Sequence, residues 1–228
     1  MIDIVRASFN FDTPAPPEDD LIAYARRIFD KMDTAVEELL SFEDYSLYLA
    51  VEEGSVKGFG KVAVYASAFV TCVAQYGSFI QGVEIIKRQG NDVAQAIIRA
   101  ASGDEMLQHI PIKTRVDTRA VSRLERLFVK VRDREISPED ATLRALAVLD
   151  PTKTELPPEA QCEIAIAFGS LRLNPEQLPL DLEIGEKTVP PSIPTPRRNK
   201  PITAAQHLLV VIERKEKLSQ PRFRKEYR

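Results

Sequence analysis

The sequence predicts an α+β protein that is mainly helical, with a few short strands, and three observations carry this prediction. Residues Ile2–Phe11 alternate imperfectly between apolar and polar side chains, which is typical of a strand. Several later segments repeat apolar residues at helical spacing. The segment between Lys61 and Glu84 contains no charged side chain, which predicts one long helix. The chain has 228 residues, of which 44% are hydrophobic, enough for one ordinary domain or two small ones.

Residues 1–53 are predicted to form an acidic strand–helix segment. Ile2–Phe11 is the strand, and the prolines between 14 and 17 end it and open a helix over Glu18–Leu40. The apolar stripe of that helix contains Leu21, Ile28, Met32, Val36 and Leu39. Tyr45–Val51 is either a short strand or the approach to the next helix.

Residues 54–90 are predicted to form the long apolar helix, centred on Val62–Val83. As a helix this uncharged run would span roughly 33 Å at about 1.5 Å per residue, close to the ~30 Å hydrocarbon core of a bilayer. Lys61 stands at one end and Lys87 at the other, an arrangement that suits lipid headgroups. The sequence therefore predicts a helix long enough to be transmembrane.

On a helical wheel this segment has a small polar face opposite a large apolar one. The polar face, within an arc of about 80°, contains Ser67, Thr71, Gln75, Ser78 and Gly82. Copies packed with this face inward would line a narrow polar path, so these residues are predicted to be pore-lining or to form a helix interface. The alternative is a core helix of a soluble domain whose polar stripe meets neighbouring elements or water.

Residues 91–150 are predicted to be helical, with a short helix at Asn91–Ala101 and a basic helix at 114–134. Five cations recur on one face of the basic helix: Arg115, Arg119, Arg123, Arg126 and Lys130. They are candidate nucleic-acid or anion-binding residues. The alternative is a solvated face neutralised by the acidic segments 1–53 and 135–196, with net charges of −9 and −7. The sequence Ser137-Pro138-Glu139-Asp140 predicts the start of a further helix that ends at Leu149.

The remaining third of the chain changes character, because ten of the 16 prolines lie between Pro151 and Pro201. Residues 151–187 are predicted as a Pro-rich, β-containing segment, with one or two strands in Glu163–Leu173. Residues 188–202 are predicted as an extended linker. Residues 203–228 are predicted as a basic C-terminal helix, from Thr203 to about Leu218, followed by a basic tail.

The sequence does not contain the constellation of an enzyme, so we expect no catalytic residue, no metal site, no cofactor and no small-molecule substrate. His109 and His207 lie in unrelated contexts, and the phosphate loop, the dinucleotide fingerprint and paired Cys-x-x-Cys are absent from the sequence. Cys72 and Cys162 form no spaced motif, which favours a reducing compartment.

The stretch Glu52-Glu53-Gly54-Ser55-Val56-Lys57-Gly58, the apolar run after it, and Gln75-Tyr76-Gly77-Ser78-Phe79-Ile80-Gln81-Gly82-Val83 resemble a known pattern. The pattern belongs to small membrane-channel effectors of bacterial anti-phage defence operons, and the family most similar is the Hailong system effector. The resemblance covers the region near 52–90 and extends to Ile136–Leu149. It implies a homo-oligomeric ion channel in membrane lipid of the bacterial inner membrane, held closed by a single-stranded DNA oligomer.

Two other functions stay open beside this antiviral channel. One is a soluble, cytoplasmic interaction or adaptor protein that forms a homo-oligomer through the long helix. The other is a nucleic-acid-binding protein that uses the basic residues from Arg115 to Lys130 and the C-terminal tail. A single span would place an acidic N-terminal segment or the whole region after residue 90 outside the cytosol, which argues for the cytoplasmic alternatives.

Overall fold

A computed structural model describes residues 1–12, 17–53, 56–76, 78–103, 107, 110–150, 156–171 and 208–227. Within these residues the protein is α+β, with about half of them helical. Six strands form one antiparallel sheet in the order β4-β1-β3-β2-β5-β6. The strands are β1 (Ile2–Phe11), β2 (Ser46–Glu52), β3 (Lys57–Val64), β4 (Ile112–Asp117), β5 (Leu208–Arg214) and β6 (Arg222–Tyr227). The helices are α1 (Glu18–Leu39), α2 (Ala66–Ala74), α3 (Phe79–Ser102), α4 (Arg119–Arg132), α5 (Pro138–Leu149) and α6 (Pro158–Gly169).

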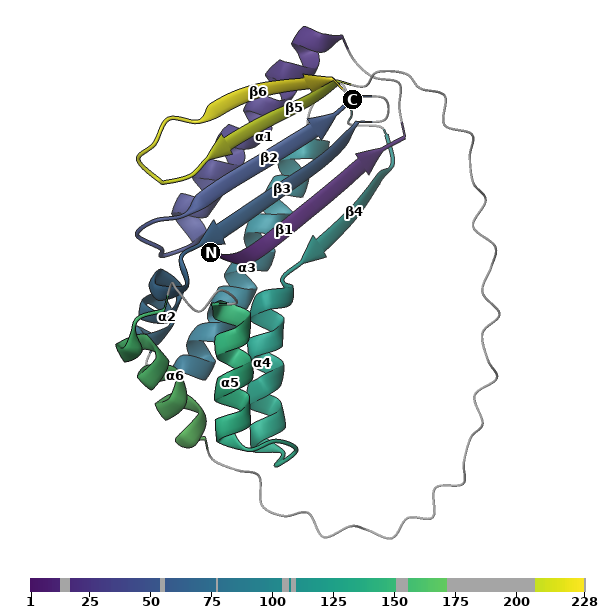
Figure 1. Ribbon diagram of the computed structural model, residues 1–228. Helices are drawn as coiled ribbons and strands as arrows, with labels where there is room; N and C mark the ends of the chain where they lie inside the picture. Colours follow the sequence, from purple (N-terminus) through teal and green to yellow (C-terminus); the bar gives the residue numbers. More distant parts are fainter. Residues whose placement is uncertain are drawn as a thin grey trace, which may run out of the picture.

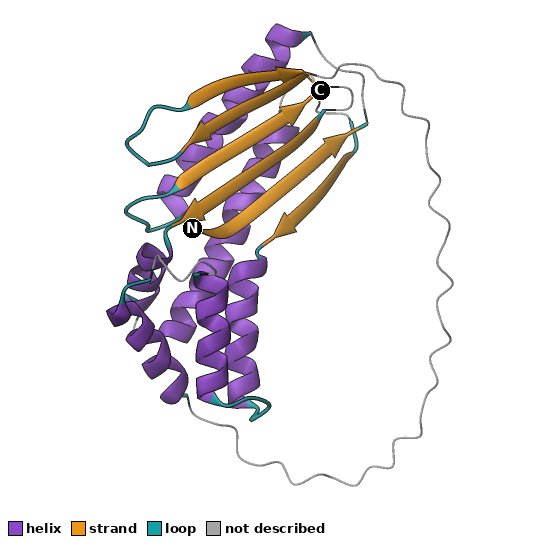
Figure 2. Cartoon of the chain, in the orientation of Figure 1, coloured by secondary structure: helices purple, strands orange, loops and turns teal. Residues whose placement is uncertain are grey.

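Two long helices cover the same face of the sheet. Helix α1 packs against β2 and β5, α3 packs against β1, and the two helices pack against each other. Figure 1 shows both helices behind the sheet, and Figure 2 shows the other four helices grouped beyond one end of the strands. The side chains between the sheet and α1 and α3 form the core, which includes Met32, Leu49 and Ile97.

The strands bury alternate residues because only one face of the sheet is covered by helices. In β1 the register slips between Asp3 and Val5, and this bulge allows the consecutive residues Ile4 and Val5 both to be buried. From Ala7 onward the strand alternates strictly, with Phe9 and Phe11 in the core.

The second helical group is built on the N-terminal half of α3. Helix α4 packs on α3 and α5, and α6 packs on α5 and α2. A column of three rings joins three of these helices: Phe79 of α3 lies 5.7 Å from Phe128 of α4, whose ring stacks at 4.3 Å on Phe168 of α6. Aromatic pairs of this kind contribute beyond the apolar area that they bury.

The prediction of one long helix around Val62–Val83 is wrong. The chain is a strand up to Val64, a short helix from Ala66 to Ala74, and then the start of α3 at Phe79. Among the described residues no single helix is long and apolar enough to cross a membrane, although α2 and α3, bent by 113° at their junction, pass that test together on length and composition. Most apolar side chains between Val62 and Val83 are buried, in the end of β3 and in both helices. Burial of these elements accounts for the absence of charged residues from this stretch.

Three further predictions of secondary structure are corrected. Residues 112–117 form β4, so the basic helix begins at Arg119 instead of residue 114. The strands expected in Glu163–Leu173 are replaced by helix α6 up to Gly169. Within the described residues from Leu208 onward, the C-terminal helix expected from Thr203 to Leu218 is replaced by the strand β5 and a turn, and β6 takes the place of the tail. The predicted linker 188–202 lies outside the described residues. In each corrected segment the secondary structure depends on the strand or helix that packs beside it, and not on the local propensity of its own residues.

Other predictions are confirmed. The strand at Ile2–Phe11, the helix from Glu18 and the helix that ends at Leu149 all form. Ser137 caps α5, where its Oγ accepts a hydrogen bond from the Asp140 backbone N–H at 3.2 Å.

The predicted boundary between the long helix and the helix at 91–101 is wrong. Gly90 does not end a helix, since α3 continues to Ser102 and the predicted helix at 91–101 is its second half.

Candidate nucleic-acid interface

The second face of the sheet is covered by no helix among the described residues. Directly opposed residues of antiparallel strands point to the same face, so the register arranges this open face in three rows across the six strands. The first row is Asp117, Arg6, Lys61, Tyr48, Glu213 and Arg222. The second is Arg115, Ser8, Phe59, Ala50, Val211 and Arg224, and the third is Lys113, Asn10, Lys57, Glu52, Leu209 and Glu226. Of these residues only Leu209 is buried.

In these three rows basic side chains outnumber acidic ones by seven to four, and Asp3, which pairs with Arg6 and lies 3.8 Å from Lys61, adds a fifth acid beside them. The cations come from every strand except β2 and β5, so they surround the centre of the face instead of lining one edge. The whole chain has a net charge of −3, and the excess of positive charge on this face is therefore local. A local basic surface on an acidic protein attracts polyanions such as nucleic acid.

Two partly exposed aromatic rings lie at the centre of the open face. Tyr48 of β2 and Phe59 of β3 meet edge to face with their centroids 6.1 Å apart. The Lys61 ammonium lies 5.8 Å from the centre of the Tyr48 ring and 3.8 Å from an Asp3 carboxylate oxygen. The face thus combines ring surfaces on which bases can stack with cations beside them that can reach phosphates.

Strand β3 is inverted relative to an ordinary amphipathic strand. Its sequence Lys57-Gly58-Phe59-Gly60-Lys61 places the two glycines toward the helices and Phe59 with both lysines on the open face. A Cβ on Gly58 would lie 1.8 Å from the Phe9 ring, so that ring from β1 fills the space under β3. This alternation is the sequence signal for Lys57, Phe59 and Lys61 as residues of one face, and it is hidden when the segment is interpreted as a helix.

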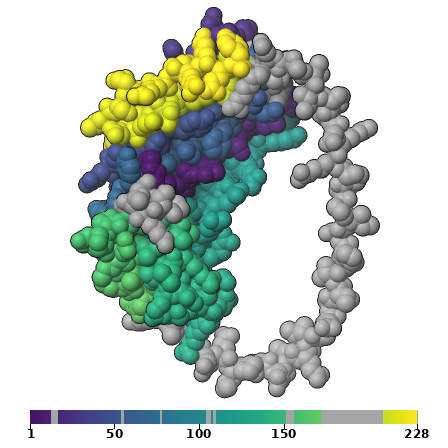
Figure 3. Space-filling view, viewed as in Figure 1, coloured from purple at the N-terminus to yellow at the C-terminus, as the bar shows by residue number. Residues whose placement is uncertain are grey.

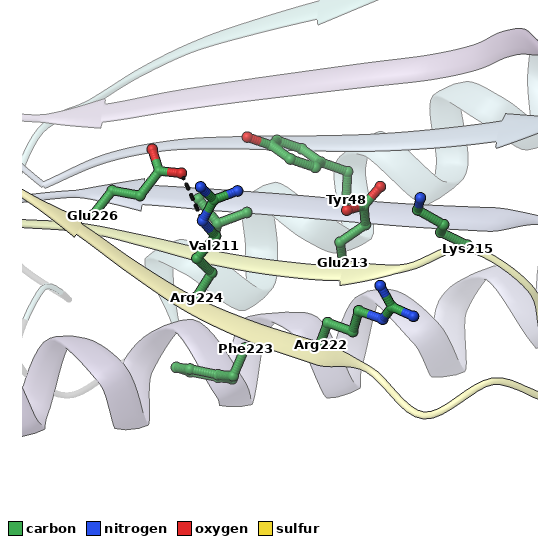
Figure 4. Close-up of a pocket in the computed structure, with 8 residues that line it drawn as sticks. All are labelled: Tyr48, Val211, Glu213, Lys215, Arg222, Phe223, Arg224 and Glu226. Carbon is green, nitrogen blue, oxygen red and sulfur yellow. Dashed lines mark ion pairs between the residues drawn. The ribbon is translucent and has the colours of Figure 1, made fainter.

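A hollow of about 550 Å³ opens beside Tyr48 at the β2, β5 and β6 end of the face. Its lining is Tyr48, Val211, Glu213, Lys215, Arg222, Phe223, Arg224 and Glu226. Figure 4 shows Tyr48, Glu213 and Arg224 on one side of the sheet and Phe223 on the other, toward α1. Arg224 is held by Glu226, with Nε 3.1 Å from the carboxylate oxygen. Figure 3 shows this part of the face as the surface of the yellow C-terminal strands, next to the blue strands β2 and β3.

A second, smaller hollow of about 300 Å³ lies at the opposite end of the first row, where β1 and β4 meet α4. Its lining includes Arg6, Arg119 and Arg123, with the acids Asp3 and Asp117 between them. The Arg119 guanidinium lies 2.8 Å from an Asp117 carboxylate oxygen but is still 63% exposed. The basic character of the open face therefore continues onto the first turns of α4.

The five predicted cations are separated into two groups. Arg115 lies on the open face in β4, and Arg119 and Arg123 line the adjoining hollow. Arg126 and Lys130 lie further along α4, where the Arg126 Nε donates to the Ser122 carbonyl at 3.1 Å and Lys130 pairs with Glu135 at 2.9 Å. The prediction of one helical stripe is thus wrong for Arg115, although three of the five residues gather at one end of the open face.

The predicted polar stripe is also divided. Ser67 and Thr71 of α2 and Gln75, its C-cap residue, line a hollow of about 270 Å³ together with Ser41 and Glu43. Cys72, in the same hollow, donates its Sγ–H to the Ser41 carbonyl at 3.6 Å, and burial raises the pKa of its thiol.

The other two members of the stripe have structural positions. Ser78 caps α3 and accepts from the Gln81 backbone N–H at 3.3 Å. Gly82 is buried where α3 crosses α2. The crossing requires glycine at this position, because a Cβ there would lie 2.4 Å from the Val73 carbonyl oxygen. Gly82 is therefore a helix-interface residue, but the interface lies within one chain.

No family model, curated protein or solved structure matches the chain. The resemblance to the Hailong effector therefore stays a prediction, as do the homo-oligomer and the membrane location. Among the described residues no group of three or more His, Cys, Asp or Glu side chains is placed to hold a metal ion.

Proposed function

We propose that the protein binds single-stranded nucleic acid on the open face of its sheet. The observation that carries the proposal is the Tyr48–Phe59 pair, two partly exposed rings side by side in the middle of a basic sheet surface. This partly exposed pair lies outside the core of the fold, which α1 and α3 complete on the other side of the sheet.

The chemistry of the face fits a single strand better than a duplex. Bases can stack on aromatic rings only when they are unpaired and turned out, whereas a duplex presents its backbone and groove edges. Lys113 and Arg115 of β4, and Lys57 of β3, are exposed on this face and are placed to contact the phosphates between stacked bases, whereas Arg6 is paired with Asp3 and Arg224 with Glu226. The six strands span roughly 24 Å at about 4.8 Å spacing, enough for a few nucleotides laid across them.

The decisive experiment measures affinity for fluorescein-labelled oligothymidylate and oligouridylate by anisotropy at low salt. Stacking contributes about 1–3 kcal/mol per base, so Phe59→Ala and Tyr48→Ala should each weaken binding by roughly five- to 150-fold. Tyr48→Phe should retain affinity, because the ring and not the hydroxyl makes the stack.

The control is Tyr65→Ala, which removes a 40% exposed ring at the N-cap of α2, outside the three rows of the open face. It should leave affinity within about twofold. Circular dichroism of each variant checks that the fold is intact. Absence of binding to either oligomer, or equal affinity of the Phe59→Ala and Tyr65→Ala variants, would overturn the proposal.

The channel function is not the proposal that this geometry favours. The stripe residues Ser67, Thr71 and Gln75 share one short helix, and Ser78 and Gly82 belong to another that is bent away from it. Separating membranes from cytosol and locating the full chain tests the channel hypothesis independently of nucleic-acid binding.

A further inference from the structure

We infer that the hollow beside Tyr48 is a guanine-binding pocket. The guanine base would stack on the ring of Tyr48, and Glu213 and Arg222 would contact its polar edges. The inference rests on the proposed function and adds a base preference to it. The three residues are consecutive members of the first row, since Tyr48 opposes Glu213 and Glu213 opposes Arg222. All three line the same hollow (Figure 4).

Glu213 is the first reason to assign base recognition to this hollow. A carboxylate contributes nothing to phosphate binding, yet Glu213 lies on a basic face between an aromatic ring and an arginine. Among the described residues the Glu213 carboxylate has no ion-pair or hydrogen-bond partner, and neither has the Arg222 guanidinium. By contrast the neighbouring Arg224 is paired with Glu226, so it is less available for a ligand.

An unpaired acceptor and an unpaired donor on adjacent strands match guanine in particular. Directly opposed side chains in an antiparallel pair have Cβ atoms about 5 Å apart. Guanine presents the acceptors O6 and N7 on its Hoogsteen edge and the donors N1–H and 2-amino on the adjoining Watson–Crick edge. Arginine is the usual partner of O6 and N7, and a carboxylate can accept from the ring N–H and the amino group.

The other bases satisfy only part of this arrangement. Adenine has no N–H at position 1 and no acceptor at position 6, so it leaves Arg222 or Glu213 without its partner. Thymine and uracil offer one N–H between two acceptors, and a carboxylate opposite an acceptor is repelled. A volume of about 550 Å³ lies within the range of small-molecule sites and admits a purine stacked on Tyr48.

The experiment uses the full chain and oligothymidylates of about nine nucleotides, a length within single-strand site sizes. One oligomer is all thymine, and the others carry a single guanine, adenine or hypoxanthine at the centre. The guanine oligomer should bind about tenfold more tightly than the all-thymine one, as expected for one bidentate set of base contacts. Hypoxanthine, which lacks the 2-amino group, should lose part of that gain.

The variants separate base recognition from strand binding. Glu213→Gln should abolish the guanine preference, so that the guanine oligomer and the all-thymine oligomer bind this variant with equal affinity. Glu216→Gln, in the turn between β5 and β6, removes an exposed carboxylate outside the hollow and should retain the full preference. Equal affinity of the unmodified protein for all four oligomers, with Tyr48→Ala still weakening all of them, would overturn the guanine pocket while the proposed function stands.

Competition with guanosine monophosphate distinguishes a base within a strand from a free nucleotide. If the pocket reads a base in a strand, millimolar nucleotide should displace the guanine oligomer only weakly. Glu213-dependent binding of the nucleotide without binding of any oligomer would overturn the proposed strand binding and support the guanine pocket by itself. Binding of neither would overturn both.

Discussion

The Arg214 guanidinium of β5 donates two hydrogen bonds to the Asp33 carboxylate of α1, 181 residues earlier in the chain. One of them, from Nη1 to Oδ2, measures 2.8 Å. Tyr45 completes the cluster, since its hydroxyl donates to Asp33 at 3.1 Å and accepts from Arg214 at 3.1 Å. The Arg214 side chain is only 9% exposed. This cluster joins the C-terminal hairpin, and with it the hollow beside Tyr48, to the N-terminal half of the fold.

Replacing Asp33 with Asn should destabilise the protein by about 3 kcal/mol, because it leaves the buried Arg214 charge without its counterion. We expect the low end of the range for buried pairs, since the Asp33 side chain is 25% exposed. The free energy of unfolding in urea measures the loss. Asp30→Asn, on an exposed position of the same helix, should change it by less than about 0.5 kcal/mol. Equal stability of the two variants would show that the ion pair contributes nothing net.

Tyr45 should make stability fall as the pH rises above about 10. Burial, and then the Asp33 charge, raise the pKa of the Tyr45 hydroxyl above its ordinary value of 10.0. Between the unfolded and folded pKa values the folded state keeps a proton that the unfolded state has lost, so stability present below pH 10 is lost as the pH rises.

The slope that Tyr45 adds should approach about 1.4 kcal/mol per pH unit, and Tyr45→Phe should remove it. Unfolding free energies measured from about pH 9 to pH 11 test this. The matched control is Tyr65→Phe, which alters an exposed tyrosine and should retain the slope. A Tyr45→Phe variant with the same pH dependence as the unmodified protein would contradict the prediction.

Gly82→Ala should destabilise the protein by about 1–3 kcal/mol, the usual cost of overpacking. Its Cβ would lie 2.4 Å from the Val73 carbonyl oxygen, which is backbone, so α2 and α3 must move apart. Gly169→Ala is the matched control, because nothing lies within 4 Å of a Cβ there. Thermal unfolding should show a lower midpoint for the first variant and an unchanged or higher one for the second. Equal midpoints would mean that the crossing of α2 and α3 is looser than described.

Salt dependence should divide the predicted cations into those that contact the strand and those that do not. Each phosphate contact contributes about 0.7 to the slope of log affinity against log salt for a single strand. Arg115→Ala should therefore reduce the slope by about 0.7, because Arg115 lies on the open face. Lys130 lies near the C-terminal end of α4 and pairs with Glu135, so Lys130→Ala should leave the slope unchanged. Binding of labelled oligothymidylate at several salt concentrations gives both slopes. If the two variants lose the same slope, the strand follows α4 instead of the sheet.

Local signals in the sequence were sufficient for three elements of the fold. The alternation of Ile2–Phe11, the apolar stripe of the helix from Glu18, and the Ser137-Pro138 start of α5 each predict what forms. These signals succeed because a cap, a proline and a periodic stripe act on neighbouring residues, whatever the rest of the chain does.

The candidate site could be predicted only in part. Arg115, Arg119 and Arg123 belong to the five cations predicted from the sequence as candidate anion-binding residues, and the structure places these three at one end of the open face. Tyr48 and Phe59 are missed, because their pairing needs β2 and β3 to be adjacent strands. Glu213 is missed for the same reason, since its place beside Tyr48 depends on a strand from the distant N-terminal part of the chain.

The sequence by itself determined that the protein is α+β, that Val62–Val83 is uncharged, and that 113–134 is basic. Only the tertiary structure decided what the uncharged run is: the end of a central strand and two short crossing pieces of helix. The physical reason is that absence of charge reports burial and not conformation. The end of a central strand and a helix packed on other helices both bury apolar side chains, and only the partners that cover those side chains distinguish one from the other.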